Sequence, residues 1–325
     1  MKFFSLALRR FTAALPALFI ILSGLFLLLQ LAPGDTVDAL VAQVGGGDPT
    51  MIEELRKYYA LDQSTSTRLG DYLWRLVHLD LGQSAIYAKP VAEVIIERLP
   101  ATLLLMGSAL ALAIFFGMTL GILAARRVNR WPDSLISTLG LVCYAMPSFW
   151  FGLMGIFVFA VWLAWLPAGG FGTVGAGLTG VAKWLDIVWY LVLPTVTLAL
   201  MFLAVYLRIM RASMLEVMTL DFVRTARAKG LSANRVLVRH VLRNALLPLV
   251  TLIGLQAGTM LGGSVVIETV FALPGLGRLA YESVVQRDLN TLLGIVFVSA
   301  LLVIAINFIV DLLYARLDPR INASH

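Results

Sequence analysis

The chain has 325 residues, 60% of them hydrophobic, and a mean hydropathy of +0.89. A soluble domain is about 45–50% apolar, so this excess excludes an ordinary soluble protein and indicates one that crosses a membrane several times. The net charge of +6 does not indicate nucleic acid as a partner, because the basic residues gather at the ends of apolar runs. The single cysteine, Cys143, excludes an intrachain disulfide.

Six stretches are apolar and long enough to cross a bilayer, which takes about 20 helical residues. They lie at 11–31, 102–124, 134–166, 189–210, 247–271 and 291–314. These stretches predict an all-α, polytopic membrane protein with six transmembrane helices. The first is longer than the apolar core of a signal peptide, about 7–15 residues, and no small-residue cleavage site follows it. We therefore expect it to stay as an uncleaved anchor.

The stretch 32–99 is predicted to form a small folded segment outside the membrane. It contains ten acidic and six basic residues, and its apolar residues recur at helical spacing within 55–61 and 69–81. It either caps the outer face or docks a partner. The expected division is thus 1–31 for the cytoplasmic end and first helix, 32–99 for the external segment, and 100–325 for a five-helix core with a cytoplasmic loop at 211–246.

The third apolar stretch, 134–166, is too long for one perpendicular crossing. Pro147 lies inside it, and a proline removes a backbone hydrogen bond and bends a helix. We expect a single kinked and tilted helix here.

The distribution of basic residues predicts the orientation. With six spans, 16 of the 25 basic residues fall on one side: at the N-terminus, at 126–130, in the loop 208–243, and at Arg316 and Arg320. Basic residues mark the cytoplasmic side of a membrane protein. Both termini are therefore expected in the cytoplasm of a multi-pass membrane protein.

Several kinds of chemistry have no candidate residues in the sequence. It has no Gly-x-x-x-x-Gly-Lys-Ser/Thr phosphate loop, no His/Cys cluster at metal-ligand spacing and no acid pair placed for general acid–base work. We expect no catalytic residue, no metal site and no cofactor in this chain. Ionisable residues within the spans are few, namely Glu268 near the outer end of the fifth and Asp311 near the inner end of the sixth. Ion- or proton-coupled carriers place such residues at mid-membrane, which favours energy supplied by another subunit. The alternative to a transporter powered by another subunit is an ion- or proton-coupled secondary carrier, or a channel, acting without ATPase partners.

The stretch 221–230 is a short, basic, amphipathic segment between two apolar runs. Asp221 suits a helix N-cap, and Gly230 suits the left-handed C′ position that ends a helix. Phe222 and Ala226 fall on one face, while the basic residues stay in water. A membrane protein has good reason to expose such a segment if it docks into a soluble partner. The residues assigned to this contact are Asp221, Phe222, Arg224, Thr225, Ala226, Arg227, Ala228, Lys229 and Gly230.

A second helix is predicted to start at Ser232. On it Arg235, Arg239 and Arg243 recur every four residues and form one basic stripe. Such a stripe either contacts anionic lipid headgroups or takes part in the docking.

The fifth apolar stretch carries Gly254, Gly258 and Gly262 on one helix face, where small residues allow close packing. Residues two positions further on lie about 160° around the helix, so we expect them to face a passage. Gly117 and Gly121 in the second stretch are expected to serve packing only. The residues predicted to line the passage are Met146, Ser148, Gln256, Met260 and Ser264.

Five sequence motifs carry a family resemblance. They are Ala-Pro-Gly-Asp at 32–35, Arg-Thr-Ala-Arg-Ala-Lys-Gly at 224–230, Arg-Asn-Ala-Leu-Leu-Pro at 243–248, Glu-Thr-Val-Phe-Ala-Leu-Pro-Gly-Leu-Gly at 268–277 and Leu-Asp-Pro-Arg-Ile at 317–321. Together they resemble the inner-membrane permeases of binding-protein-dependent ABC importers, in particular the dipeptide and oligopeptide permease B family of the peptide and nickel branch. The resemblance covers essentially the whole chain.

The resemblance implies a type I importer fold and a permease that translocates peptides of the dipeptide or oligopeptide class, with 224–230 seated in an ATPase cleft. It implies as partners a homologous second permease, two ABC ATPase subunits that bind ATP and Mg²⁺, an external substrate-binding protein and membrane lipids. ATP hydrolysis would then belong to the partners, and this chain would not be an enzyme. Where the general importer motif begins Glu-Ala-Ala, this chain has Arg224-Thr225-Ala226, as is usual in the peptide branch. It has Leu289-Asn290 where the branch often has a proline, which leaves open a dipeptide, a longer peptide, glutathione, a nickel chelate or another solute as cargo.

Overall fold

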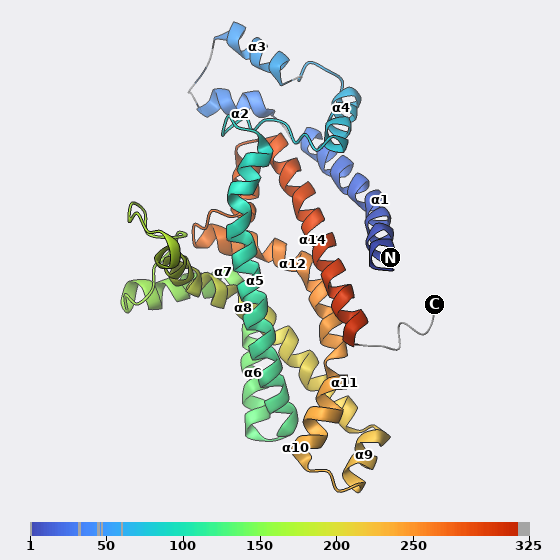
Figure 1. Cartoon of the computed structure of the whole chain (residues 1–325). Coiled ribbons are helices and arrows are strands. Elements are labelled where there is room, and N and C mark those ends of the chain that lie inside the picture. The colour runs from blue at the N-terminus through green and yellow to red at the C-terminus, as the bar shows by residue number, and fades with distance from the viewer. Residues whose placement is uncertain (1, 32–33, 44–45, 47, 60, 318–325) are drawn as a thin grey trace. The chain divides into compact units, whose positions relative to one another are not determined.

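The computed structural model describes residues 2–31, 34–43, 46, 48–59 and 61–317, and this part of the chain is helical with no β-strand (Figure 1). Within these residues, four helices are long and apolar enough to cross a membrane, and up to six spans result if each of two bent helix pairs counts as one. The predicted all-α polytopic fold is thereby confirmed. Two of the five motifs, 32–35 and 317–321, lie partly outside the described residues.

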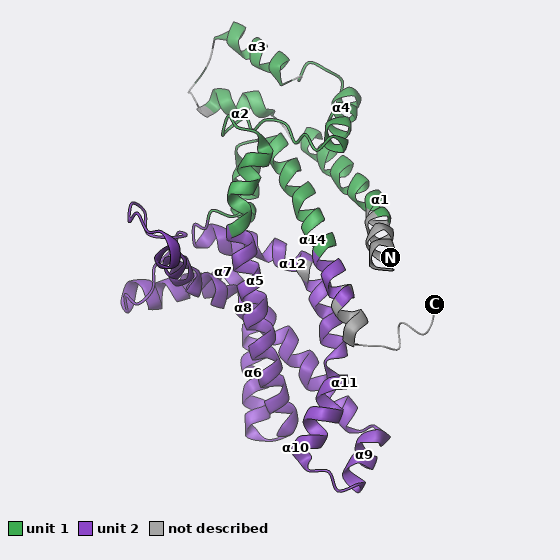
Figure 2. Cartoon of the chain, viewed as in Figure 1, with its two compact units in different colours: residues 1–100, 274–305 green, residues 101–273, 306–325 purple. Residues whose placement is uncertain are grey.

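Contacts divide the chain into two compact units, coloured separately in Figure 2. Unit 1 comprises residues 1–100 and 274–305, and unit 2 comprises residues 101–273 and 306–325. The change of unit at Pro100 lies close to the predicted boundary between the external segment and the helical core. The return of 274–305 to unit 1 has no counterpart in that predicted division.

Unit 1 contains the short helices of the external segment. Its helices are α1 (Lys2–Leu31), α2 (Thr36–Gln43), α3 (Pro49–Tyr58), α4 (Thr65–Val77), the start of α5 (Val91–Arg126), α13 (Leu276–Val285) and the first part of α14 (Leu289–Leu317). Side-chain caps fix two of these helices: the Asp48 carboxylate accepts from the Thr50 N–H, and the Ser64 hydroxyl accepts from the Thr67 N–H. The helical spacing seen in the sequence is thus real, although α3 ends at Tyr58 rather than 61 and α4 ends at Val77 rather than 81.

Two apolar clusters hold unit 1 together. In the first, Val91 and Ile95 of α5 pack with Leu279 of α13 and Ile295 of α14. The helices approach so closely that a Cβ on Gly294 would lie 2.6 Å from the Val91 side chain. The second cluster joins α1 to α4 and α14, and its buried members are Leu22, Phe26, Tyr72 and Leu293.

Unit 2 is built around one long buried helix, α8 (Gly180–Met218), against which α6, α7 and α12 pack. Its other elements are the rest of α5, α6 (Trp131–Ala145), α7 (Ser148–Gly155), the π-helix η1 (Ile156–Trp162), α9 (Asp221–Ala228), α10 (Ala233–Val236), the π-helix η2 (Leu237–Leu242), α11 (Arg243–Ala245), α12 (Leu247–Val270) and the end of α14. The side chains of Tyr206, Met210 and Met214 on α8 are fully buried.

Glycines bring α5 against α8, which confirms the packing role expected of them and identifies the partner helix. A Cβ on Gly117 would lie 2.7 Å from the Tyr206 Cβ, and one on Gly121 would lie 2.8 Å from the Leu207 carbonyl oxygen. Real Cβ atoms do not approach backbone this closely, so these two positions set the distance between the helices.

The prediction of one kinked helix for 134–166 is wrong. The helix is broken: α6 ends at Ala145, and the two halves of this region meet at an angle of 100°. The physical reason is local, because the ring of Pro147 disfavours helical backbone at the residue before it. Met146 and Pro147 are both extended, with ψ of 142° and 137°.

Candidate functional site

The segment 221–230 folds as a short helix with a complete C-terminal cap. Helix α9 is followed by Gly230 with φ of +77°, the left-handed conformation predicted for it. The Gly230 N–H donates to the Arg227 carbonyl (2.9 Å) and the Leu231 N–H to the Ala226 carbonyl (3.4 Å). These two bonds are the pair that defines a Schellman motif. The cap turns the chain sharply and fixes where α9 ends.

The N-terminus of α9 lies one residue earlier than predicted. Leu220, with extended backbone, is the N-cap, and Asp221 is the first helical residue. The reason is that α8 ends at Met218, and the Leu220 carbonyl already accepts from the Val223 N–H at 3.0 Å. The Asp221 carboxylate still lies at the positive end of the helix dipole. It also forms an exposed ion pair with Arg224 at 3.5 Å.

The buried face of α9 also differs from the prediction. Val223 and Ala226 pack into the core of unit 2, whereas Phe222, expected on the same face as Ala226, is 41% exposed. Residues three apart on a helix share a face, and so do residues four apart. Both Val223 and Phe222 could therefore share a face with Ala226, and it is Val223 that packs into the core. The outer surface of α9 therefore presents an aromatic ring next to exposed basic residues, namely Arg224, Arg227 and Lys229. An apolar centre with a charged rim is typical of a protein-docking surface.

A second basic helical segment, which begins with α10, directly follows the cap of α9. Ser232 is the N-cap of α10, as predicted, although its side chain makes no capping hydrogen bond. The arginines of the stripe, Arg235, Arg239 and Arg243, are all exposed. The opposite side of this helical run, with Val236 and Val241, is buried.

An ion pair that the sequence did not suggest fixes α8 close to its junction with α9. The Asp133 carboxylate, 4% exposed, accepts from Nε and Nη2 of Arg211 at 2.6 and 2.7 Å and from the Asn129 N–H at 2.9 Å. The two residues are 78 positions apart, so no local pattern could have paired them. The bidentate contact joins the first turn of α6 to the last part of α8.

The residues predicted to line a passage fall in two places within unit 2. Met146 and Ser148 lie half-buried at the break between α6 and α7. Gln256 is half-buried on α12 and accepts from the Thr259 hydroxyl at 2.7 Å. Met260 and Ser264, also on α12, are each 1% exposed, so neither meets open space within this chain.

The faces of α12 are thus partly the reverse of those expected. Gly254 packs as predicted, since a Cβ there would lie 3.0 Å from the Asn307 Oδ1. At Gly258 and Gly262 nothing lies within 4 Å of a Cβ. The buried side is the one that carries Met260 and Ser264, because α12 packs this side on α8. Whether Met260 and Ser264 contribute to a passage stays a prediction.

A buried carboxylate lies at the far end of α12. Glu268 is fully buried and accepts from the Thr102 hydroxyl at 2.8 Å. The sequence placed Glu268 near a membrane boundary without identifying its contact with α5.

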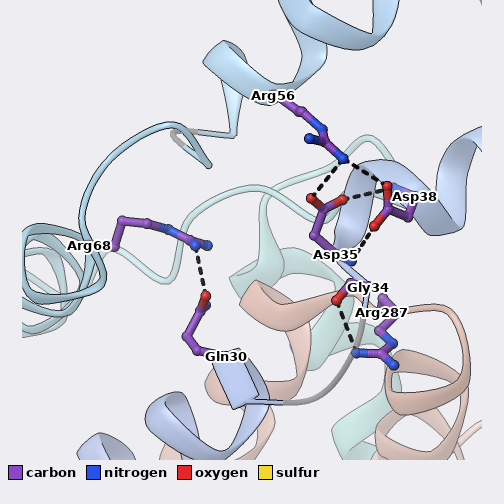
Figure 3. A network of polar contacts seen from close by, with 7 residues as sticks. All are labelled: Gln30, Gly34, Asp35, Asp38, Arg56, Arg68 and Arg287. Carbon is purple, nitrogen blue, oxygen red and sulfur yellow. Dashed lines mark hydrogen bonds and ion pairs between the residues drawn. The ribbon is translucent and has the colours of Figure 1, made fainter.

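Unit 1 carries a polar network around the start of α2 (Figure 3). Asp35 and Asp38 accept from each other's backbone N–H at 2.8 and 2.9 Å, and Arg56 of α3 bridges both carboxylates at 3.0 and 3.5 Å. Arg287 donates to the Gly34 carbonyl at 3.2 Å. The Arg287 bond ties the start of the external segment to a residue 253 positions away in the sequence.

Arg68 of α4 lies beside this network and donates to the Gln30 side chain at 2.8 Å (Figure 3). Burial lowers the pKa of its guanidinium, and the negative charge of Asp35 partly offsets this effect. A half-buried arginine with one neutral partner keeps donors for a further acceptor.

The chain is similar to known transport proteins over nearly its whole length. It is 40% identical over 318 residues, 98% of this chain and 99% of the other, to a protein of Brucella abortus (strain 2308) whose name assigns it to a peptide transport system as the permease. It is 39% identical over 315 residues, 97% of this chain and 98% of the other, to the glutathione transport system permease protein GsiC of Escherichia coli (strain K12).

Solved structures of ABC transporters have a similar fold. An inward-facing form of the MetNI methionine ABC transporter matches with a TM-score of 0.56 and 17% identity, covering 70% of this chain and 97% of that one. Residues 117–323 match the family described as binding-protein-dependent transport system inner membrane component. The family match and the 40% identity over 98% of the chain show that this protein belongs to the binding-protein-dependent transport system inner membrane components.

Proposed function

We propose that this chain forms one half of the membrane passage of an ATP-driven importer, and that its cargo is a short peptide or a peptide-like solute such as glutathione. The cargo class rests on relatives at 39–40% identity whose names specify peptide and glutathione transport. Their similarity extends through the external segment as well as the core, so the whole chain is comparable.

The surface of α9 is the observation that best supports an ATPase partner. It combines the exposed ring of Phe222 with basic side chains, and a Schellman motif fixes its end. Two partner ATPase subunits would bind ATP and Mg²⁺, and one of them would receive α9 in a cleft. A homologous permease and an external substrate-binding protein would complete the importer.

The connection between α9 and the central helix α8 is short. Only Thr219 and Leu220 separate α9 from α8, and α8 packs against α6, α7 and α12. A displacement of α9 by a closing ATPase would therefore pass directly to the central helix of unit 2. The Asp133–Arg211 pair makes α6 move with α8.

In this arrangement α9 and both termini lie in the cytoplasm and the segment 32–99 lies outside. The assignment rests on the 16 basic residues that share one side. The basic stripe of Arg235, Arg239 and Arg243 would then lie at the inner membrane surface, within reach of anionic headgroups.

The experiment compares two adjacent residues of α9 in the assembled importer. Phe222→Ala removes an exposed ring, so the chain should fold normally but ATPase activity should no longer drive peptide uptake. Val223→Ala removes a buried side chain and should instead destabilise the chain by about 1–2 kcal/mol. Uptake and ATP hydrolysis in proteoliposomes, with thermal unfolding as the check on folding, separate the two effects. Coupled uptake at the normal rate in Phe222→Ala would contradict the docking role.

A further inference from the structure

Unit 1 contains a cavity of about 520 Å³ that the proposed transport mechanism does not use. Its lining comes from parts of the sequence that are far apart: α1, the end of α3, α4, the turn at 80–83 and the start of α14. Cavities of roughly 300–1,000 Å³ are the usual size for small-molecule sites. Its walls combine aromatic rings with charged side chains of both signs.

Arg75 of α4 is the first hydrogen-bond donor of this cavity. Its guanidinium has no hydrogen-bond or ion-pair partner among the described residues. It lies beside Gly82, where a Cβ would come 3.4 Å from both the Arg75 Nη1 and the Asn290 Nδ2. Gly82 has φ of +79°, the left-handed conformation that favours glycine. The turn therefore holds a guanidinium and an amide group side by side on the cavity wall.

Tyr72 is the second donor. The residue is 7% exposed, its ring stacks on Phe26 at 5.8 Å, and its hydroxyl is buried with no hydrogen-bond partner in the described part of the chain. Burial raises the pKa of Tyr72 to about 12, an effect that the charge of Arg75 partly offsets. The hydroxyl is therefore protonated at neutral pH. A buried polar group left unpaired costs about 1–3 kcal/mol, which an acceptor on a ligand would relieve.

The opposite charge is present as well. Asp71, one helical turn before Arg75, has no side-chain partner within the described residues, and Asp80 accepts only from the Gly82 N–H at 2.9 Å. Trp74 and Tyr58 supply exposed aromatic surface to the same cavity. Donors suited to a carboxylate, aspartate side chains and aromatic walls in one cavity match a small amphipathic zwitterion.

We propose that this cavity binds a short peptide as its zwitterion, with the peptide carboxylate on Arg75 and the Tyr72 hydroxyl and the peptide ammonium on Asp71. The choice of a peptide rests on the proposed function. The site itself belongs to unit 1 and is separate from the predicted passage residues of unit 2. It gives the permease its own contact with the cargo on the external side.

Calorimetric titration of the purified full chain in lipid nanodiscs tests the proposal. The probes are alanyl-phenylalanine, its C-terminal amide and its N-acetyl form. The amide lacks the negative charge of the dipeptide, and the N-acetyl form lacks its positive charge. The free dipeptide should bind at least about tenfold more tightly than either capped form, because each cap removes a charge-assisted hydrogen bond. Equal binding of the three, or no saturable binding up to about 10 mM, would overturn the site.

Variants locate the binding. Tyr72→Phe removes only a hydroxyl that has no partner, so thermal unfolding should not change while affinity for alanyl-phenylalanine falls severalfold. Arg75→Gln should weaken binding about tenfold or more. Lys57→Gln is the matched control, since Lys57 is exposed and its partner among the described residues is Glu53 at the surface. Wild-type affinity in both cavity variants would refute the assignment.

The result of the binding titration is independent of the uptake measurement on the assembled importer. Discrimination among the three probes without peptide uptake by the assembled importer would contradict the proposed function and leave the site intact. Peptide uptake without binding to the isolated chain would overturn the site alone.

Discussion

At Gly230 the chain leaves α9 with φ of +77°, and nothing lies within 4 Å of the position that a Cβ would take. A side chain there meets no obstacle, so any effect of substitution must come from the backbone. A β-branched residue in left-handed conformation costs about 1 kcal/mol or more.

Gly230→Val is therefore expected to displace the end of α9 and to separate ATP hydrolysis from peptide uptake, while the chain still inserts into the membrane. Gly230→Asn is the control, since asparagine tolerates left-handed backbone and should retain coupling. The ratio of peptide imported to ATP hydrolysed in proteoliposomes is the measurement. A normal ratio in Gly230→Val would contradict a fixed α9 as the coupling element.

At single residues, prediction from the sequence succeeded where a backbone conformation is readily adopted by one residue type. Gly230 was predicted because few residues other than glycine adopt positive φ readily. It failed at Phe222, because which face of a two-turn helix is buried depends on the core it meets. That core is formed by residues such as Met214 and Val236, on other helices.

At the scale of elements, the contact of α5 with α8 gives the sharpest prediction. A Cβ on Gly121 would lie 2.8 Å from both the Leu207 carbonyl oxygen and the Met210 Cβ, so Gly121→Ala must separate the helices. The expected cost is about 1–3 kcal/mol. Gly107 lies on the same helix with nothing within 4 Å, so Gly107→Ala should be neutral or slightly stabilising.

Thermal unfolding of the two variants in the same detergent checks this contrast. Equal melting temperatures for Gly121→Ala and Gly107→Ala would mean that α5 does not pack on α8 as described.

The sequence predicted the existence of the elements better than their connections. Apolar runs located the helices, because crossing a bilayer requires length and hydropathy together. Pro147 signalled a disturbance but not its size, since α6 must also pack back on α8 to turn a kink into a break of 100°. The ion pair of Asp133 with Arg211 and the bond from Arg287 to Gly34 join residues 78 and 253 positions apart. Contacts of that range leave no periodic trace in a single sequence.

At the scale of the whole molecule, the proposed orientation rests on charge. A cysteine at Thr65 in the external segment and one at Arg235 in the basic stripe, each in a Cys143→Ser background, should be labelled from opposite sides of the membrane. Both positions are exposed, so the reagent can reach them. The measurement is labelling of intact cells and of inverted vesicles by a membrane-impermeant maleimide. Labelling of both positions from the same side would contradict the topology.

Partner subunits, rather than an ion gradient, are proposed to drive cargo through this chain. Proteoliposomes that contain the complete importer and its binding protein allow uptake of a labelled dipeptide to be followed under two conditions. Uptake is predicted to require ATP on the side where α9 lies, to persist when a protonophore removes the proton gradient, and to stop when ATP is omitted. Uptake without ATP that follows an imposed proton gradient would contradict the account and favour a secondary carrier.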